Sequence, residues 1–399
     1  MVLFVNWGDN IDMKYLVFIF FFLTTSLSCF PIDASDNRLY SIKPKTNNGK
    51  RWRIGYLEGG AFSNYPINLK ALVEALADLG WVEITNEIPL NHENDTRDLW
   101  AWISRNVKSK YIKFLPDAYW SSNWDMKKLR KKNKRIIIKR LKFKKDIDLM
   151  LAMGTWAGQD LANNRHSTPV VVMSSSNPID SKIIKSAQDS GYNHVNARVD
   201  PTRYERQVRL FHDIIGFTKL GIVYETDTVE GRTYAAISDV QKVAKERGFE
   251  IIQCNAPFSS VSKKDSTQAV FDCHEKIAPK VDAFYLTVHR GVTLNKMSQL
   301  LPPFFEHKIP TFSQKGALEV KYGVLFSIAR AGFKYISRFH AETIAQILNG
   351  ARPRDLEQVF EDPPRIAINT KTAQIIGYDP PVEILETADE IYTEIAVKK

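Results

Sequence analysis

The sequence predicts an α/β protein of two lobes, in which each lobe is a doubly wound parallel sheet flanked by helices and a ligand cleft lies between the lobes. From residue 51 onward, short apolar runs rich in β-branched residues alternate with amphipathic helices, which is typical of parallel βαβ units. The alternation restarts near residues 195–198, where a second lobe would begin. The 399 residues are also enough for two domains of ordinary size.

The first lobe opens with a predicted strand at 53–57, which runs through Glu58-Gly59-Gly60 into a predicted helix at 64–79. Apolar residues recur in this helix every three or four positions, and Gly80 follows as a C-terminal cap. Two more strands are predicted at 147–153 and 169–173, and each ends in a loop of small or polar residues.

The second lobe contains a predicted helix at 204–215. Its predicted strands lie at 220–224, 249–254, 283–288 and 310–314. A strand at 323–328, a helix at 335–348 and a strand at 365–369 are expected to be returns between the lobes. We therefore assign residues 52–197 and 324–352 to the first lobe, and residues 198–323 and 353–399 to the second.

The chain begins with features of an export signal. An apolar run at 15–23 follows a single lysine and ends in small residues, which is typical of a secretory signal peptide and is too short to span a bilayer. We predict a signal peptide over 1–28 and a linker over 29–51, with translation starting at Met13 because two acidic residues lie upstream of it. Lipidation of Cys29 is the alternative to simple cleavage. A periplasmic location follows from this prediction.

Residues 83–145 fit the α/β pattern least well. We interpret them as an insertion with its own small aromatic cluster, in which the tryptophans pack against one another rather than stack on a ligand. The tryptophans are Trp100, Trp102, Trp120 and Trp124.

Within this segment, residues 126–145 contain 12 Lys or Arg and no acidic residue. We interpret the run as the solvated back of an amphipathic helix. Its apolar face would contain Met126, Leu129, Ile136, Ile137 and Leu141. Contact with an anionic lipid surface is the alternative, since an exported protein meets lipid more often than nucleic acid. We expect no nucleic-acid partner.

The remaining cysteines, Cys254 and Cys273, could form a disulfide in an oxidising compartment, because one closes a predicted strand and the other lies on the following helix. The sequence alone does not establish their distance. His274-Glu275 resembles a metal-binding pair, but no second pair of ligands accompanies it at a suitable spacing. We predict a surface helix there, with no metal and no cofactor.

Several segments together resemble a known family, the substrate-binding proteins of ABC transporters related to tryptophan and tyrosine import, which have the type 1 periplasmic-binding fold. The matching segments are IGYLEGG, DLMLAMGTWAGQDLA, TPVVVMSSSNPID, KLGIVYE, ILNGARPRDL and IAINTKTAQIIGYDPP. The resemblance covers residues 52–395. It implies a cleft between two lobes and a small organic ligand. The chain departs from the family in the long aromatic and basic segment, and in SSSNPID, where an acid commonly precedes the proline.

In open parallel sheets, ligands bind beyond the carboxyl ends of the strands, so the loops after the strands are the candidate site. In the first lobe, Gly154-Thr155 begins a helix whose amides, with the Thr155 hydroxyl, could bind a carboxylate. The other candidates of this lobe are Glu58, Gly59, Phe62, Tyr65, Trp156, Ser174, Ser175 and Ser176. The aromatic residues could supply an apolar surface.

The second lobe contributes candidates of the same kind. They are Tyr224, Glu225, Asp227, Arg232, Thr287, His289, Arg290 and Ser313. Either Glu58 or Glu225 could balance the ammonium group of an amino acid, and Arg290 could replace Thr155 as the carboxylate ligand. Polar residues at strand ends also serve as helix caps, which is the competing explanation for each of them.

The expected function is a non-catalytic receptor that closes around a small molecule by hinge motion and delivers it to an ABC permease in the inner membrane. The solute would be an amino acid or a related small organic acid. The sequence contains no GxSxG, HExxH, GxxxxGK or dinucleotide-binding motif. Two alternatives stay open, namely a ligand-binding sensory partner of a membrane receptor and a cleft enzyme that uses His289, Arg290 and Glu225.

Overall fold

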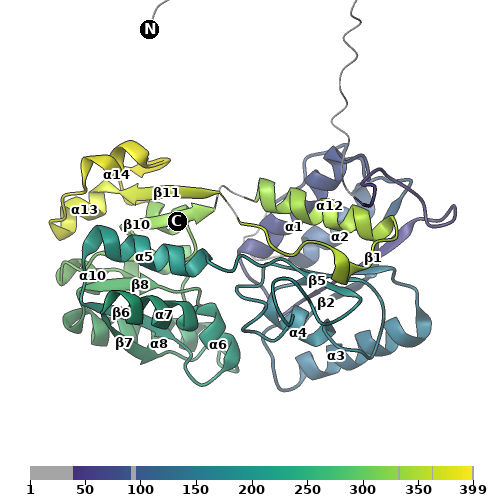
Figure 1. Cartoon of the computed structure of the whole chain (residues 1–399). Coiled ribbons are helices and arrows are strands. Elements are labelled where there is room, and N and C mark those ends of the chain that lie inside the picture. Colours follow the sequence, from purple (N-terminus) through teal and green to yellow (C-terminus); the bar gives the residue numbers. More distant parts are fainter. Residues whose placement is uncertain (1–38, 91–95, 331–332, 362, 398–399) are drawn as a thin grey trace, which may run out of the picture. The chain divides into compact units, whose positions relative to one another are not determined.

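The computed structural model describes residues 39–90, 96–330, 333–361 and 363–397. Tyr40–Lys399 form one compact unit that contains two β-sheets (Figure 1). The predicted two-lobed α/β class is confirmed. The predictions of a start at Met13, a signal peptide and lipidation at Cys29 lie outside the described residues.

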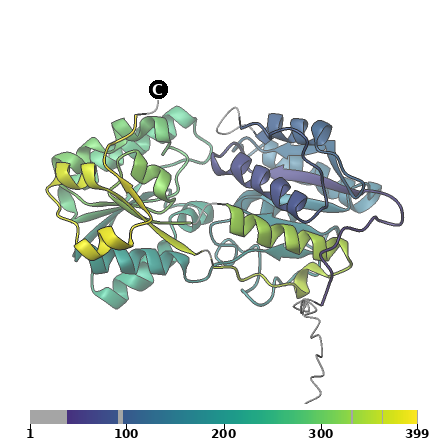
Figure 2. The same ribbon diagram turned by 90° about the horizontal axis from the view of Figure 1, so that it is seen from above.

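The sheet of the first lobe has five parallel strands in the order β2-β1-β3-β4-β5. The strands are β1 (Trp52–Glu58), β2 (Ile112–Ser121), β3 (Leu149–Met153), β4 (Val170–Met173) and β5 (Val195–Ala197). One face is covered by α1 (Asn64–Asp78), α2 (Thr96–Asn106) and α12 (Lys334–Leu348), and the other by α3 (Leu129–Lys139) and α4 (Thr155–Leu161). Helices α1 and α12 lie side by side (Figures 1 and 2).

The sheet of the second lobe has seven strands in the order β12-β11-β10-β9-β8-β6-β7. The strands are β6 (Lys219–Tyr224), β7 (Glu250–Asn255), β8 (Ala283–Leu286), β9 (Thr311–Ser313), β10 (Phe326–Arg330), β11 (Pro364–Asn369) and β12 (Glu390–Tyr392). Neighbouring strands are parallel except β10 and β11, which pair antiparallel, so the expectation of a wholly parallel sheet is corrected there.

Helices cover both faces of this second sheet. On one face lie α5 (Arg203–Ile215), α7 (Ile237–Arg247), α13 (Thr370–Ile376) and α14 (Val382–Thr387). On the other lie α8 (Lys263–Ile277), α9 (Met297–Leu300), α10 (Pro302–Glu306) and α11 (Ala317–Lys321). The short α6 (Val229–Tyr234) follows β6. The predicted strands coincide with the observed ones apart from their ends.

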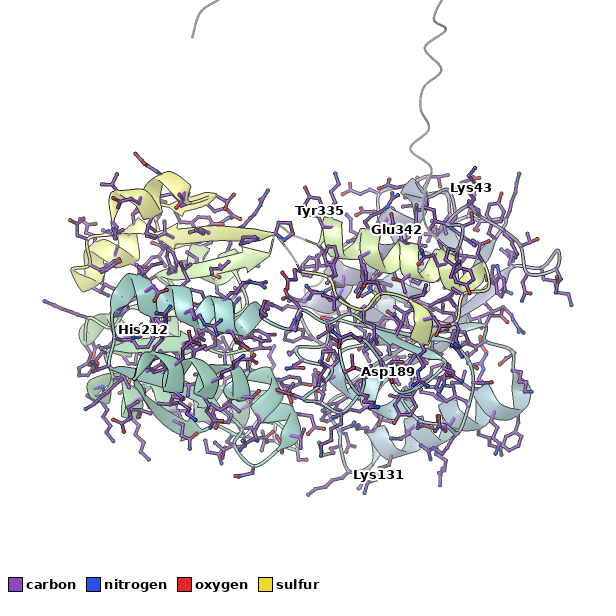
Figure 3. The ribbon with its side chains drawn as sticks, in the orientation of Figure 1. Lys43, Lys131, Asp189, His212, Tyr335 and Glu342 are labelled. Atoms are coloured by element: carbon purple, nitrogen blue, oxygen red, sulfur yellow. A yellow bond between two sulfur atoms is a disulfide. The ribbon has the colours of Figure 1, made fainter. Side chains whose placement is uncertain are left out.

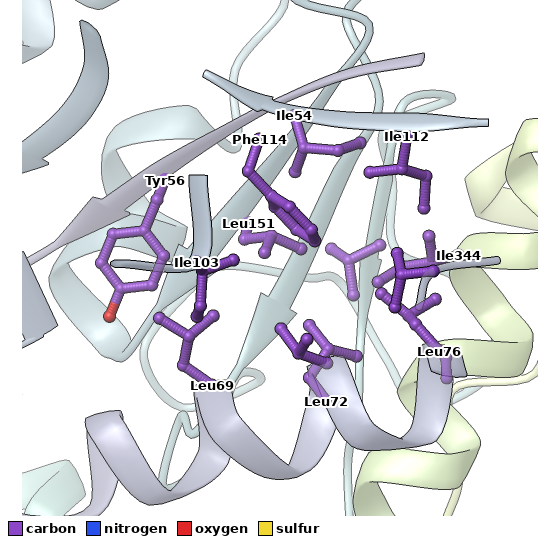
Figure 4. Close-up of a cluster of buried hydrophobic side chains, with 14 of the residues drawn as sticks. Ile54, Tyr56, Leu69, Leu72, Leu76, Ile103, Ile112, Phe114, Leu151 and Ile344 are labelled. Atoms are coloured by element: carbon purple, nitrogen blue, oxygen red, sulfur yellow. The ribbon is translucent and has the colours of Figure 1, made fainter. Parts of the chain in front are cut away.

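Helix α1 shows how the local sequence sets an element's limits. It ends at Asp78, and Gly80 follows with φ +77° while the Trp81 amide donates to the Leu76 carbonyl at 2.9 Å. A positive φ is cheap only for glycine, so Gly80 stops the helix as predicted. The buried face of α1 contains Leu69, Leu72 and Leu76 (Figure 4). These pack with residues of β1, β2 and α12, and each buried leucine contributes roughly 1.5–3 kcal/mol.

Residues 83–145 are not an insertion, which corrects the expectation from sequence. Strand β2 pairs with β1 as an integral strand, and α2 places Trp100 in the core of the lobe, 5.4 Å from the Tyr56 ring. The β1–β2 register jumps, since Ile54 pairs with Phe114 but Tyr56 pairs with Tyr119. This bulge interrupts the alternation of apolar and polar residues, which is why the strand was missed. The tryptophans also do not form one cluster.

The expected assignment of residues 324–352 to the first lobe also needs correction. Strand β10 pairs with β9 and β11 in the second sheet, whereas α12 packs against α1 in the first lobe. The chain continues in the first lobe through a 3₁₀ turn, Pro353–Asp355, next to β5. It then returns to the second sheet as β11. Residues 40–51, expected as linker, lie along the first lobe, where the Ile42 carbonyl accepts a hydrogen bond from the Trp81 indole at 2.9 Å.

The basic run forms α3 and a π-helical turn, Arg140–Lys144. Ile137 and Leu141 are buried as predicted, but Ile136 is exposed and Ile138 is buried instead. Lysines cover the outer side, with Lys131 at the outer surface of the lobe (Figure 3). Arg130 differs from them, because its guanidinium pairs with Asp160 at 3.0 Å and is largely buried.

Two of the segments that connect the lobes are hydrogen-bonded to each other. The Val199 amide donates to the Gln358 carbonyl at 2.7 Å, and the Phe360 amide donates to the Val199 carbonyl at 3.0 Å. The Arg198 Nε also donates to the Phe360 carbonyl at 2.9 Å. Paired connections can bend together, so this bridge is the position at which the predicted hinge motion would occur.

Side chains of the two lobes also meet away from the hinge. Arg130 lies 3.4 Å from Glu230 of α6, and the Ser238 hydroxyl donates to the Asp180 carboxylate at 2.5 Å. Next to Ser238, the Oδ2 atom of Asp239 is buried with no hydrogen-bond partner among the described residues. Burial raises the pKa of Asp239 to about 7, and the nearby charges of Asp180 and Glu205 add to the shift.

No helix in the described part of the chain combines the length and apolar character required to cross a membrane.

Cys254 at the end of β7 and Cys273 on α8 are joined by a disulfide in the structure, 19 residues apart in sequence. Replacing both cysteines by alanine should lower the free energy of unfolding by about 3 kcal/mol, because the crosslink restricts the unfolded chain. Urea denaturation of the two proteins measures the difference. Reduction of the unsubstituted protein should give a similar loss, and an unchanged midpoint in both experiments would contradict the expectation.

The buried carboxyl group of Asp239 should make the free energy of unfolding depend on pH. Its native pKa lies above the value of about 3.8 for a solvated carboxyl, so the native state binds more protons than the unfolded state between roughly pH 4 and 7. Stability should therefore fall as pH rises through that window. Asp239→Asn should remove a penalty on the order of 2 kcal/mol at pH 8 and change little at pH 4. Denaturation of the unsubstituted protein and the Asp239→Asn variant between pH 4 and 8 measures this difference. Asp379→Asn, at an exposed position, is the control. The same dependence of stability on pH in all three proteins would contradict the expectation.

Candidate functional site

A cavity of about 210 Å³, here called the chamber, is bordered by residues of both lobes. The residues that line it are Ala61, Phe62, Ser63, Trp124, Lys263, His289, Arg290, Val292, Thr293, Leu294, Asn295 and Lys315. A smaller pocket of about 40 Å³, here called the recess, shares Phe62, Trp124 and Arg290 with it. The other residues that line the recess are Tyr65, Thr155, Ser174, Ser176, Tyr234, Phe258 and Val288.

These side chains follow the carboxyl ends of the strands in both sheets. In the first lobe, Phe62 comes after β1, Trp124 after β2, Thr155 after β3, and Ser174 and Ser176 after β4. Parallel strands bring their carboxyl ends to one edge of a sheet, which is the usual position of ligand sites in α/β proteins. The first lobe therefore contributes four neighbouring loops to the site.

The second lobe is built in the same way. Tyr234 lies on α6 after β6, Phe258 follows β7, Arg290 follows β8 and Lys315 follows β9. Contacts join the two halves of the site. The Lys315 ammonium lies 5.3 Å from the centre of the Phe62 ring, and the Tyr234 hydroxyl interacts with the Thr155 hydroxyl.

Gly154 permits close packing beside Thr155. Its φ is +85°, and a Cβ atom at this position would lie 1.9 Å from the Tyr65 hydroxyl oxygen. Only glycine meets both conditions, so the residue brings Tyr65 against the end of β3. The Thr155 hydroxyl is 3.4 Å from that of Ser175, whereas the hydroxyls of Ser174 and Ser176 have no partner among the described residues.

Trp124 lies over another glycine pair. A Cβ atom on Gly60 would be 2.6 Å from the Trp124 ring, and one on Gly59 would be 3.0 Å from the Trp124 ring and 3.0 Å from the Cβ atom of Trp156. The Trp124 indole donates to the Ala61 carbonyl at 3.0 Å, although its own backbone has φ +58°. A non-glycine residue in this conformation is strained, so local packing holds Trp124 at the mouth of the site.

Seven predicted residues line the chamber or the recess. In the first lobe these are Phe62, Tyr65, Thr155, Ser174 and Ser176. His289 and Arg290 of the second lobe join them, which brings the set to seven. The remaining predicted residues are close to the site but do not border its space. They are Glu58, Gly59, Gly154, Trp156, Ser175, Tyr224, Glu225, Asp227, Arg232, Thr287 and Ser313.

The two predicted partners for an ammonium group are occupied within the protein. Glu58 is buried and accepts hydrogen bonds from Tyr56 and Tyr119, each at 3.0 Å, and from the Thr96 hydroxyl. Burial raises the pKa of Glu58, while these hydrogen bonds oppose the shift. Glu225 accepts from the Thr228 hydroxyl at 2.9 Å and from the Ser259 hydroxyl at 2.6 Å. Both carboxylates therefore hold loops in place.

The other residues behind the cavity also have structural partners. The Thr287 hydroxyl donates to the Val223 carbonyl at 2.6 Å, and the Ser313 hydroxyl donates to the buried Glu319 at the same distance. Asp227 accepts from the Asn255 amide at 3.1 Å. The Tyr224 hydroxyl donates to the Gln253 side chain at 2.7 Å. These contacts fix the strand ends from which the lining residues project.

His289 borders the chamber, yet both ring nitrogens have partners. One lies 2.9 Å from the Ala256 carbonyl, and the other accepts from the Gly291 amide at 3.0 Å. Burial lowers the pKa of His289 to about 4, so the ring is neutral near pH 7. No group of His, Cys, Asp and Glu side chains suited to a metal ion occurs among the described residues.

Several lining residues were not predicted from the sequence. The most prominent are Trp124, Tyr234, Phe258, Lys263 and Lys315. Phe258 and Lys315 follow predicted strands, so the rule used for the other loops could have found them. Trp124 was instead assigned to packing, because the strand before it was not recognised. Tyr234 and Lys263 lie on helices, where no strand end marks them.

Residues 119–392 match the sequence profile of the family described as ABC transporter substrate binding protein. A curated relative, the tyrosine-binding protein of Clostridioides difficile, is 22% identical over 233 residues. That match covers 57% of this chain and 63% of the relative, so it spans less than two thirds of the relative's length.

Solved structures show the same fold at low identity. A Streptococcus pneumoniae ABC domain in complex with L-Trp has a TM-score of 0.62 and 19% identity, over 85% of this chain and 99% of that one. The ligand-free, open structure of a substrate-binding protein with adhesive properties from Clostridium difficile has a TM-score of 0.56 and 17% identity, over 86% and 100%. Because the family profile covers more than half of the chain, the protein belongs to the ABC transporter substrate-binding protein family.

Proposed function

We propose that this protein captures an amino acid or a related small organic acid in the chamber and recess, closes around it by hinge motion, and delivers it to the permease of an ABC importer. The observation that carries the proposal is a cavity in which the strand-end loops of both lobes place aromatic rings, hydroxyls and an arginine. A solute held by both lobes at once favours the closed form.

Two similarities support the choice of solute class. One structural neighbour was solved with L-Trp, and the curated relative is named for tyrosine. The recess offers flat apolar surfaces from Trp124, Tyr234 and Phe258, which suit a ring. Hydroxyls of Ser174 and Ser176 provide polar contacts beside those surfaces.

The contacts between the lobes support closure as the mechanism. Val199 and Val359 pair at the hinge, while Arg130 with Glu230 and Phe62 with Lys315 join the lobes on the side of the cavity. The latter contacts are few, and Arg130 already has Asp160 as its closer partner, so they hold the lobes together only weakly without a ligand. A bound solute would add contacts to both lobes and shift the balance toward closure.

Binding without catalysis is part of the proposal. The acid–base site considered from sequence would need His289 and Glu225 to be free, but both are held by backbone and hydroxyl groups. Substrate-binding proteins of ABC transporters work outside the cytoplasm. A periplasmic location, with export by the leader and an optional lipid anchor at Cys29, is therefore proposed together with the importer.

The solute-binding proposal is tested on protein that has been unfolded and refolded under oxidising conditions to remove bound ligand. A thermal-shift screen of amino acids and small organic acids should give a selective shift, since a ligand at a hundred times its Kd stabilises the native state by about 2.7 kcal/mol. Phe62→Ala should then weaken binding of that solute by roughly tenfold or more in calorimetry, because an apolar contact is lost.

Phe143→Ala is the matched control, since Phe143 is exposed on the outer π-helical turn. It should leave the affinity unchanged. No stabilisation by any solute of these classes, or an equal loss of affinity in both variants, would contradict the proposal.

We also propose that the outer side of α3 contacts an anionic membrane surface. Exposed lysines on this segment accompany the exposed apolar side chains of Ile136 and Phe143, a combination that suits an interface between lipid headgroups and acyl chains. Arg130 is excluded from the contact, because its charge is used by Asp160.

Replacing Lys127, Lys128, Lys131 and Lys132 by glutamine should lower binding to phosphatidylglycerol vesicles by about tenfold or more, given about 1 kcal/mol per lysine near such a surface. Solute affinity should not change. The matched control is the same charge change at four exposed lysines of the second lobe, Lys245, Lys264, Lys276 and Lys280. If vesicle binding is the same in both variants, or if solute binding is lost, the contact is refuted.

A further inference from the structure

The charges that border the cavity are all of one sign. Lys263, Arg290 and Lys315 line the chamber or the recess, and no Asp or Glu does so among the described residues. Lys315 has a partial counter-ion, since Glu319 lies 3.8 Å from its ammonium. Lys263 and Arg290 have no carboxylate partner in the part of the chain that the structure describes. The space is therefore suited to an anion and offers nothing to neutralise a cation.

Arg290 is the most telling of the three. Its Nη1 atom donates to the carbonyls of Phe258 and Val261, each at 3.0 Å, which fixes the guanidinium where chamber and recess meet. The Nε and Nη2 atoms have no acceptor among the described residues. Burial lowers the pKa of Arg290, as expected for a cation that has lost water without gaining a counter-ion. The Nε and Nη2 atoms of a guanidinium can together bind a carboxylate through two hydrogen bonds.

An amino acid would bring an ammonium group together with its carboxylate. The nearest predicted partners for that group, Glu58 and Glu225, are directed at their own loops and saturated by hydroxyl and amide donors. Leaving an ammonium in the cavity beside three cations, with no carboxylate to face it, would cost several kcal/mol in desolvation and repulsion.

The recess determines what accompanies the anion. Phe62, Trp124 and Phe258 provide apolar surfaces, while Tyr65 and Tyr234 provide rings with hydroxyl edges. The Trp124 indole nitrogen is already bonded to the Ala61 carbonyl, so the ring offers its face. The recess alone, at about 40 Å³, is too small for an aromatic ring, but the chamber of about 210 Å³ shares Phe62 and Trp124 with it. A ring that lies in the chamber against these two side chains can place its acid group on Arg290.

We propose that the solute is an aromatic carboxylic acid without an α-ammonium group, with its carboxylate on Arg290 and its ring against Phe62 and Trp124, the aromatic residues that line both the chamber and the recess. This inference rests on the proposed solute-binding function and narrows it. The expected net charge of the solute distinguishes this proposal from a receptor for aromatic amino acids. The lining of the cavity can balance a negatively charged group of the solute, but it contains no carboxylate to balance an ammonium group.

The test compares matched compounds by calorimetry on the refolded full chain near neutral pH. The pairs are L-tryptophan with indole-3-propionate, L-phenylalanine with 3-phenylpropionate, and L-tyrosine with 3-(4-hydroxyphenyl)propionate. Each acid differs from its amino acid only by the ammonium group. At least one acid should bind about tenfold more tightly than its amino acid, and the amines tryptamine and phenethylamine should not bind.

Tighter binding of the amino acid in every pair that binds overturns this inference but leaves the proposed function intact. Binding of none of the acids also overturns this inference, whereas the proposed function fails only if the wider thermal-shift screen of amino acids and small organic acids gives no shift, so the two failures are distinguishable. A variant then tests the position of the charge. Arg290→Gln should weaken binding of the preferred acid by about tenfold or more, and Arg290→Lys should lose less because the charge stays.

Arg365→Gln is the matched control, with the same change of charge at an exposed residue of the same lobe that borders neither space. It should keep the affinity of the unsubstituted protein. The melting temperature of each unliganded variant shows whether it is folded. A folded Arg290→Gln protein that binds the acid as well as the control does would refute the assignment.

Discussion

The direction of the strands is the constraint on which the rest of the structure depends. Parallel strands end at a common edge, and their helices begin there, so the loops that carry Phe62, Trp124, Thr155 and Ser174 all lie at one edge of the first sheet. The core can then be apolar and continuous while the loops vary. The single antiparallel pair, β10 with β11, lies toward the far side of the second sheet from β6 and β7 and leaves their loop ends unaffected.

Loops at a strand edge must still be held rigidly, and two buried carboxylates do this. Glu225 accepts from the amide and the hydroxyl of Ser259, which fixes the loop that carries Phe258. Glu58 gathers hydroxyls from Tyr56, Thr96 and Tyr119 behind Phe62. A carboxylate can be buried only when hydrogen bonds offset its desolvation, and here the donors come from separate segments. The acids therefore position the loops around the cavity and do not themselves border it.

Most helices and strands could be predicted because the residues that determine each of them are close together in the sequence. The spacing of leucines in α1, the stop at Gly80 and the apolar runs of β3 and β4 depend on residues near one another in sequence. Strand β2 escaped prediction since its register jumps between Phe114 and Tyr119, which breaks the alternation. The division between β10 and α12 escaped it for another reason. The lobe to which a segment belongs is decided by contacts with residues far away in the sequence. The local sequences of β10 and α12 do not indicate which lobe each joins.

Residues that line the cavity could be predicted only where they follow a strand that is recognisable in the sequence. Thr155 and Arg290 follow recognised strands, whereas Trp124 owes its place to a strained backbone and to the room above Gly60. The sequence does not show in which direction a side chain points. For this reason Glu58 and Glu225 were predicted as ligand contacts together with Arg290. The orientation of each carboxylate depends on the donors that surround it, and some of these lie far away in the sequence. Ser259 is 34 positions from Glu225, and Tyr119 is 61 positions from Glu58.

On the proposed function, the uncompensated charge of Arg290 links recognition to closure. Its hydrogen bonds to the carbonyls of Phe258 and Val261 lie within the second lobe, so closure without a solute would remove water from the guanidinium and supply no counter-ion. An anion supplied by the solute removes that penalty, and its ring adds contacts with Trp124 and Tyr234 from opposite lobes. On the proposed charge class, the residue that selects the solute also disfavours the empty closed form. Selectivity and hinge motion then have one physical origin, the need to pair a buried cation.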